Sequence, residues 1–223
     1  ALCATLESEV SELDETDRTE MLESLGLTER LAEVRTSFEK FLNKLYGRRA
    51  VMPAGSLIWI AETYYGLGRG MGNDNKTVAE DYFKQAAESF QVILDRDQKE
   101  GNFVDDLREK GVTLRLAHCR RHQGDFEIAL KLIQDLLAEN AKFLQAQFEA
   151  AYILQDWGSS GQGDSYKKLL DAIQGQRDDN NGGIWGWGHI AINLRSAISF
   201  DQLSPEKQTE YEEKYLEARY NVS

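Results

Sequence analysis

Two histidines four residues apart, His118 and His122, are the first candidates for chemistry in this 223-residue chain. On a helix this spacing places both imidazoles on one face, as a zinc site requires. The sequence offers no third ligand, and Arg120 and Arg121 lie between the two histidines and would repel a cation. We therefore interpret the pair as part of a polar helix face and expect no metal.

No arrangement of nucleophile and base predicts an enzyme. Cys119 adjoins His118, but adjacent residues of a helix point in different directions. The run from Gly66 to Gly72 has the composition of a phosphate-cradling loop. It lacks the Gly-Lys-Ser/Thr ending and the preceding strand that such loops have. We accordingly expect no catalytic residue and no cofactor.

The charge of the chain excludes some classes of partner. The formal net charge is −12, with 26 Lys and Arg against 38 Asp and Glu. Nucleic acids need clustered positive charge, so no nucleic-acid partner is expected. No apolar run approaches the roughly 18 residues of a membrane span, so no membrane insertion is expected either. The two cysteines, Cys3 and Cys119, are interpreted as free thiols, which slightly favours the cytoplasm but leaves the compartment undetermined.

Residues 107–139 predict a pair of antiparallel helices. Two amphipathic segments flank Gly124 and Asp125. Glycine suits the left-handed residue after a helix, and aspartate is a common N-cap of the next one. Apolar residues of the second segment form one stripe of a helix with about 3.6 residues per turn. They are Phe126, Ala129, Ile133, Leu136 and Leu137.

The same spacings recur along the chain. The stripe recurs as Phe83, Ala86, Phe90, Ile93 and Leu94, as Leu31, Val34, Phe38, Phe41 and Leu42, and, in its first three positions, as Tyr166, Leu169 and Ile173. An alanine precedes a glycine by the same interval in Ala61–Gly68, Ala117–Gly124 and Ala151–Gly158. We predict that the alanines allow a neighbouring helix to approach and that the glycines end their helices.

At this point the chain resembles the tetratricopeptide repeat (TPR) family. The stretch AHCRRHQGDFEIALKLIQDLL at 117–137 and the stretch IAETYYGLG at 60–68 carry the resemblance, which extends over residues 31–175. It implies an all-α fold, an α-solenoid of antiparallel helix pairs. Compared with the family, the turns after Gly68 and Gly158 look lengthened, so long loops within the repeats are expected.

Three segments are predicted. Residues 1–50 would hold N-terminal capping helices and a first helix pair, and residues 51–175 the TPR-like repeats. Residues 176–223 would form a divergent C-terminal helix pair that continues into a further repeat outside the chain. Leu2, Leu6, Val10 and Leu13 predict an opening helix within 1–25. Thr77 with Glu80, and Ser204 with Pro205, are signals of helix N-termini.

The resemblance also implies where a partner would bind. Family members hold extended peptides or partner helices on the concave face made by their first helices. The matching residues here are Ile58, Glu62, Tyr65, Leu114, His118, Arg121, His122, Phe148, Tyr152, Gln155 and Asp156. The expected function is a non-catalytic protein–protein interaction scaffold. A structural spacer within a larger repeat protein is the alternative, and an enzyme or metal protein that uses the His118–His122 face is the third possibility.

The kind of peptide can be narrowed by the same resemblance. Family members that grip a C-terminal carboxylate place a lysine and an asparagine at the positions of Ile58 and Glu62. An acidic tail would meet Glu62 without that lysine, and the net charge of −12 would add long-range repulsion. Recognition of an acidic C-terminal tail is therefore not expected.

Overall fold

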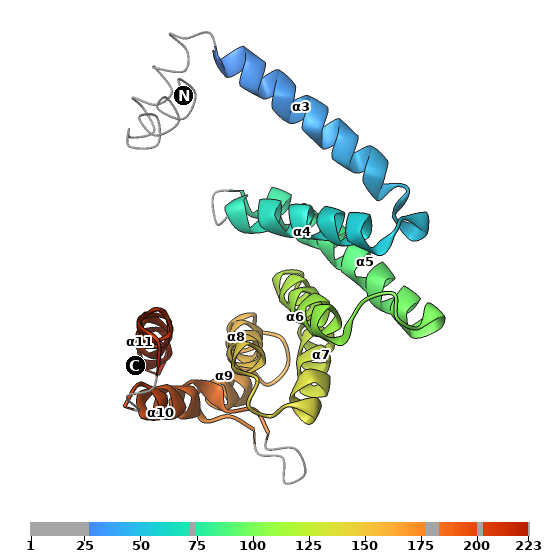
Figure 1. Ribbon diagram of the computed structural model, residues 1–223. Coiled ribbons are helices and arrows are strands. Elements are labelled where there is room, and N and C mark those ends of the chain that lie inside the picture. Colours follow the sequence, from blue (N-terminus) through green and yellow to red (C-terminus); the bar gives the residue numbers. More distant parts are fainter. Residues whose placement is uncertain (1–26, 72–74, 177–182, 200–202, 223) are drawn as a thin grey trace. The chain divides into compact units, whose positions relative to one another are not determined.

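The computed structural model describes residues 27–71, 75–176, 183–199 and 203–222 (Figure 1). These residues form helices, together with one isolated antiparallel bridge between Gln176 and Ile184. The all-α class predicted from the sequence is therefore confirmed. By its contacts the chain divides into two compact units, residues 1–49 and 50–223.

The described part of the first unit, residues 27–49, consists mainly of the helix α3 (Leu27–Tyr46). The backbone closes it through bonds from the Gly47 amide to the Asn43 carbonyl and from the Arg48 amide to the Leu45 carbonyl. Val34, Phe38 and Phe41 of the predicted stripe are exposed, so that part of the predicted core is wrong. The predicted opening helix within 1–25 lies outside the described residues.

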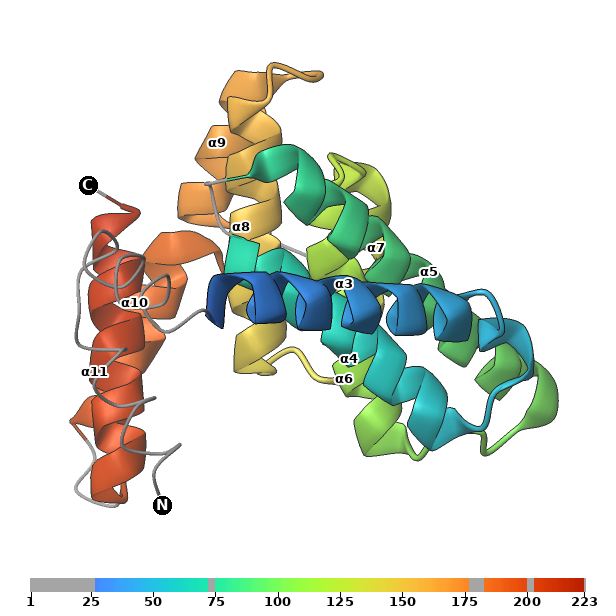
Figure 2. The same ribbon diagram turned by 90° about the horizontal axis from the view of Figure 1, so that it is seen from above.

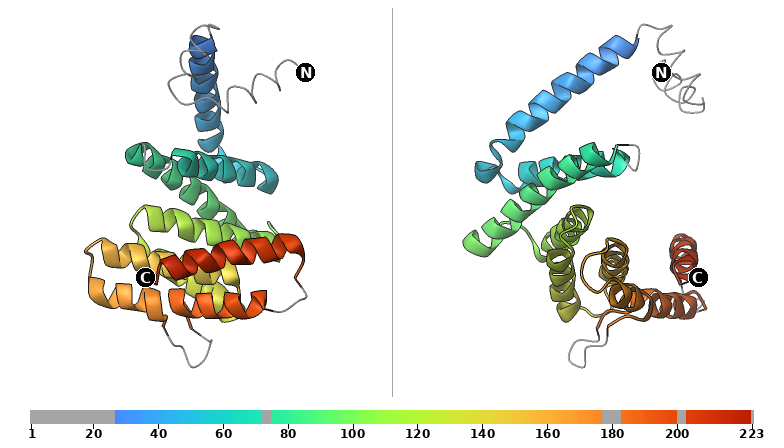
Figure 3. Two further views of the ribbon diagram at one scale, coloured as in Figure 1. Left: turned by 90° about the vertical axis from the view of Figure 1, so that its left-hand side faces the viewer. Right: turned by 180° about the vertical axis from the view of Figure 1, so that it is seen from behind.

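The second unit begins within the short 3-10 helix η1 (Arg49–Val51) and continues as a run of consecutive helices. They are α4 (Ala54–Met71), α5 (Lys76–Glu100), α6 (Asp106–His122), α7 (Phe126–Glu139), α8 (Leu144–Ser159), α9 (Ser165–Gln174), α10 (Gly186–Ile198) and α11 (Pro205–Tyr220). Each contacts the next, and α8 also contacts α6 and α10 (Figures 1 and 2). Figure 3 shows α8 and α11 on one side of the C-terminal region and α9 and α10 on the other.

The pair α6–α7 forms largely as its sequence predicts. Gly124 has φ of +78°, the left-handed conformation expected after α6. Asp125 stands at the N-cap of α7, but its carboxylate accepts a bond from Arg120 instead of capping the helix. The whole α7 stripe from Phe126 to Leu137 is buried. Ala117 of α6 is fully buried and belongs to the same core as the α7 stripe.

The other two repeated glycines do not end their helices, and this prediction is wrong. Gly68 lies three residues before the end of α4, and Gly158 lies in the last turn of α8. A Cβ atom at Gly68 would lie 3.0 Å from the Phe83 ring, and one at Gly158 would lie 2.6 Å from Cγ of Leu169. These glycines are helix-contact residues, because only a missing side chain leaves room for the next helix.

The connection after Gly68 is consequently shorter than predicted. Residues 69–71 continue α4, and α5 begins at Lys76, capped by the Asn75 side chain, which accepts from the Val78 amide. Thr77 is therefore not the cap. At the other end of the unit, the Ser204 hydroxyl accepts from the Lys207 amide and Pro205 opens α11, which confirms that predicted start.

The stripe of α9 is exposed, unlike those of α5 and α7. Tyr166 is 77% exposed, and Leu169 and Ile173 are also exposed. The α7 stripe is covered because α6 and α8 both contact that helix. At α9, a Cβ atom at Gly186 would lie 2.9 Å from the Ala172 carbonyl, so α10 begins against the C-terminal end of α9. The stripe prediction fails there because periodicity does not show whether a neighbour covers the face.

The contact role of Gly158 predicts a loss of stability on adding one methyl group. Gly158→Ala should lower the unfolding free energy by about 1–3 kcal/mol, because the methyl overlaps Leu169. The matched control is Gly66→Ala in α4, where a Cβ would meet nothing within 4 Å. Helix propensity should there raise stability by about 0.5–1 kcal/mol. Urea denaturation measures both, and an unchanged midpoint for Gly158→Ala would contradict the contact role.

Candidate functional site

A hollow of about 730 Å³ opens among α4, α6, α8 and α11. Five of the predicted partner-binding residues line it: Tyr65, Leu114, His118, Phe148 and Tyr152. The helices α4, α6 and α8 supply these five, as the sequence predicts. Lys214 and Glu217 of α11 form a further wall, which the sequence does not predict.

Aromatic rings make up much of the hollow's wall. Tyr65 is half-buried, with its ring centroid 5.3 Å from that of His118 and 6.2 Å from that of Phe83 in edge-on contacts. Tyr152 is also half-buried, and its ring meets the buried Trp187 edge-on at 4.7 Å. Phe148 is buried more deeply and has only 7% of its surface exposed. The two tyrosines therefore contribute to the core and to the hollow at the same time.

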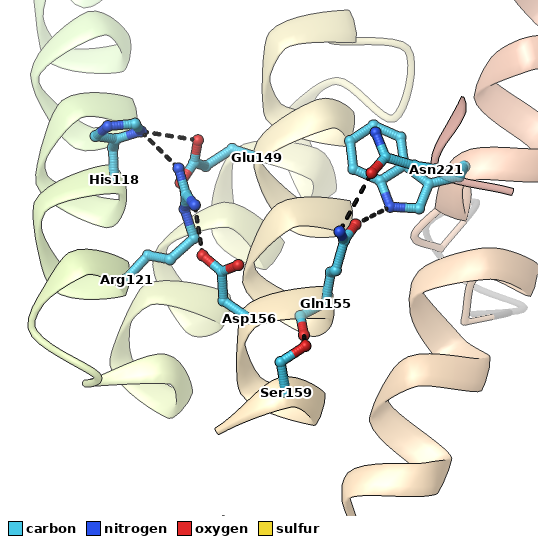
Figure 4. Close-up of polar contacts among 8 residues, drawn as sticks. His118, Arg121, Glu149, Gln155, Asp156, Ser159 and Asn221 are labelled. Atoms are coloured by element: carbon cyan, nitrogen blue, oxygen red, sulfur yellow. Dashed lines mark hydrogen bonds and ion pairs between the residues drawn. The ribbon is translucent and has the colours of Figure 1, made fainter. Parts of the chain in front are cut away.

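A buried carboxylate, Glu149, lies in the lining of the hollow and joins α6 to α8. Figure 4 shows its polar contacts. Its Oε1 accepts a bond of 2.8 Å from Nε of Arg121, and its Oε2 lies 3.2 Å from Nδ1 of His118. Arg121 also donates from Nη1 to Oδ2 of Asp156 at 2.5 Å. We call His118, Arg121, Glu149 and Asp156 the buried ionic network.

The network is electrostatically matched. Burial by itself would raise the pKa of Glu149, but the hydrogen bond from His118 and the charge of Arg121 outweigh burial and lower that pKa. Burial would likewise lower the pKa of Arg121, whereas Glu149 and Asp156 raise it. The Arg121 side chain is only 9% exposed. Arg121 is therefore committed to its own chain and does not face a partner directly.

Gln155 of the predicted set holds the C-terminal helices. Its Oε1 accepts from Nε1 of Trp187 at 2.7 Å, and its Nε2 donates to Oδ1 of Asn221 at 3.2 Å (Figure 4). The buried Gln147, which sequence reasoning missed, accepts from the Trp185 amide at 2.8 Å. Each of these bonds joins residues more than thirty positions apart, so they cannot be predicted from a local sequence pattern.

The remaining predicted residues lie outside the hollow's lining. Ile58 is half-buried on α4, and Glu62 forms an ion pair with Arg115, whose Nε lies 2.8 Å from Oε1 of Glu62. Burial raises the pKa of Glu62, and Arg115 partly offsets this. His122 lies flat on the ring of Phe83, with centroids 4.3 Å apart and planes 7° apart.

The histidine pair does not form a metal centre among the described residues. The rings of His118 and His122 are 4.7 Å apart, as their spacing predicts. Nδ1 of His118 faces the Glu149 carboxylate. Within the described ranges, no group of three or more His, Cys, Asp or Glu side chains is placed to hold a metal ion.

Removing the cation of the buried ionic network should destabilise the fold. Arg121→Met leaves Glu149 buried with only His118 beside it, so we expect a loss of about 3–5 kcal/mol. The matched control is Arg115→Met on the same helix. Its ion pair with Glu62 is more than a third exposed, so about 0–1 kcal/mol is expected. Equal urea midpoints for the two variants would show that the network does not join α6 to α8.

The lowered pKa of His122 predicts that the folded chain loses stability in acid. His122 is partly exposed to solvent. Desolvation of its ring, and then the charges of Arg121 and His118, lower its pKa from 6.5. A base with a lowered folded pKa stabilises the fold above its unfolded pKa, and this contribution falls as the pH drops toward the folded pKa.

We therefore expect the urea midpoint to fall between about pH 7 and about pH 5. His122→Phe keeps an aromatic ring on Phe83 but does not titrate, so its midpoint should fall less over this range. A decline as steep as that of the unmodified chain would show that another group is responsible.

Among the described residues, no helix has the length and apolarity needed to cross a membrane. Comparisons of the chain with protein-family models, with curated proteins and with solved structures find no match.

Proposed function

We propose that this chain is a non-catalytic protein–protein interaction module that binds a peptide segment of its partner in the hollow between α4, α6, α8 and α11. Its helices would form a TPR-like α-solenoid, with α4–α5, α6–α7 and α8–α9 as successive antiparallel pairs. The contacts of α6 with α8, and of α8 with α10, support this arrangement, because stacked pairs bring their first helices together.

The observation that carries the proposal is the state of the rings in the hollow. Tyr65 and Tyr152 are half-buried, each held by ring contacts on one side and open to the hollow on the other. A ring fixed in this way offers a large contact area without a further loss of side-chain entropy on binding. A volume of about 730 Å³ suits a few side chains of an extended peptide.

Two features favour binding over catalysis. Burial raises the pKa of the Cys119 thiol, and a buried protonated thiol is a poor nucleophile. The perturbed carboxyl of Glu149 is explained by its two partners, so it is occupied in holding α6 to α8. Perturbed pKa values of this kind also arise in structural ion-pair networks.

A spacer role is the second candidate. In that role the helices would set a distance between other parts of a longer protein, and the hollow would bind nothing. The buried ionic network would serve a spacer equally well, since it fixes α6 against α8. Only the half-open rings distinguish the two functions, so the test must act on the hollow and leave the network intact.

Gly111 permits such a test, because it lines the hollow within α6. The nearest atom to a Cβ at this position is Nη1 of Arg115 at 3.3 Å, the far end of a long, partly exposed side chain that can shift by a few tenths of an ångström. Gly111→Leu would therefore fill part of the hollow, and the gain in helix propensity, up to about 1 kcal/mol, should keep the melting temperature from falling. Gly111→Ala is the matched control, since it gains propensity but adds one methyl group.

The ligand is selected from a display library of random peptides about 12 residues long, and its affinity is measured by fluorescence anisotropy. We expect Gly111→Leu to weaken binding at least about tenfold and Gly111→Ala no more than about twofold. If no peptide is selected, the spacer role is the better account. If Gly111→Leu binds as tightly as the unmodified chain, the peptide occupies another surface.

A further inference from the structure

The hollow reverses the sign of charge that dominates the chain. The whole chain has 26 basic residues against 38 acidic ones. The lining of the hollow has four basic side chains and two acidic ones. The basic ones are Arg69, Lys110, Arg115 and Lys214, and the acidic ones are Glu149 and Glu217. An excess of one sign in a cleft focuses the local field and favours ligands of the opposite sign.

Neither acidic side chain of the lining offsets this excess fully. The carboxylate of Glu149 is already in contact with Arg121 and His118. Glu217 is the other acidic side chain, so four basic side chains of the lining face one carboxylate that a ligand can meet. Positive side chains therefore outnumber the negative ones available to a ligand.

Arg69 is the cation best placed to receive a carboxylate. It is exposed on α4, and within the described ranges no carboxylate forms an ion pair with it. Its guanidinium lies 5.9 Å from the centre of the Tyr65 ring, and that of Arg115 lies 6.0 Å from the same ring. One open aromatic ring thus has two guanidinium groups beside it.

The other cations of the lining have partners that a ligand can replace. Lys110 pairs with Glu139 at 3.0 Å, and Lys214 pairs with Glu210 at 3.1 Å. The pair of Lys110 is exposed, and exposed pairs contribute only about 0–1 kcal/mol, so a second carboxylate can share or take over that ammonium. Lys214 is partly buried, but its partner Glu210 is exposed. Lys214 also lies 5.5 Å from the centre of the Phe148 ring, so a charge and an apolar surface adjoin at this end of the hollow too.

The sequence disfavours an acidic tail because Glu62 would meet it without a compensating lysine. In the structure Glu62 is paired with Arg115, and it does not line the hollow. The net charge of −12 still slows the approach of an acidic ligand from a distance, but contacts inside the hollow are governed by its own lining.

We propose that the partner of the hollow is an extended segment in which apolar side chains alternate with aspartate or glutamate. This inference rests on the proposed function. The apolar side chains pack on Tyr65 and Tyr152, and the carboxylates meet Arg69 at one end and Lys214 at the other. A basic segment is disfavoured, because its charges would face these same groups.

The composition of the selected peptides tests the proposal. From the same random display library, we expect peptides enriched in aspartate and glutamate over the unselected pool. Changing their acidic residues to the matching amides should weaken binding at least about fivefold. Arg69→Gln should weaken binding at least about threefold, whereas Arg195→Gln, an exposed arginine on α10 outside the lining, should not. Arg69→Glu should in turn favour lysine-bearing versions of the peptides.

The outcomes separate this inference from the proposed function. If the selected peptides are neutral or basic and Gly111→Leu still abolishes their binding, the hollow is a binding site and the acidic partner is wrong. Acidic peptides whose affinity ignores Arg69→Gln and Arg69→Glu would also overturn the inference, because their charge would then be read elsewhere. If no peptide is selected, both proposals fall together.

Discussion

The carboxylate of Glu149 imposes the constraint on which this part of the fold depends. A charge buried between two helices is tolerated only with hydrogen-bonding partners, and here these are the guanidinium of Arg121 and the ring of His118, both on α6. An apolar pair of the same size would often be equally stable. The hydrogen bonds of the ionic network are directional, so they favour one relative position of α6 and α8. The width of the hollow follows from that position, because both helices line it.

The same helix, α8, transmits this position to the C-terminal end of the unit. Six residues beyond Glu149 and on another face, Gln155 accepts from Trp187 of α10 and donates to Asn221 just after α11. Trp187 is fully buried and supports the rings of Phe148 and Tyr152 from behind. The wall formed by α11 is therefore held by contacts that begin on α8.

The sequence predicts the features that depend on local spacing. Periodic apolar residues identified α5 and α7 and their buried faces, since a stripe such as Phe126–Leu137 is written within one helix. The Ala–Gly interval did not distinguish Gly124, which turns the chain, from Gly158, which admits Leu169, because both roles need only a missing side chain. Glycine spacing alone therefore cannot place helix ends.

Five of the eleven predicted partner-binding residues line the hollow, and the other six show what the sequence could not supply. Position on a helix face was predictable, but the use of each side chain depends on partners far along the chain. Arg121 and Glu149 are 28 residues apart, and Arg121 and Asp156 are 35 apart. The sequence therefore predicts that Arg121 contacts a ligand, whereas in the structure its guanidinium bonds to Glu149 and Asp156. Arg69, which the sequence places in a turn after Gly68, lies on α4 because that helix continues to Met71, and no carboxylate of the described residues forms an ion pair with it. The charge of a cleft depends on which ion pairs form within the chain, so the proposed acidic partner rests on the lining of the hollow and not on the net charge of −12.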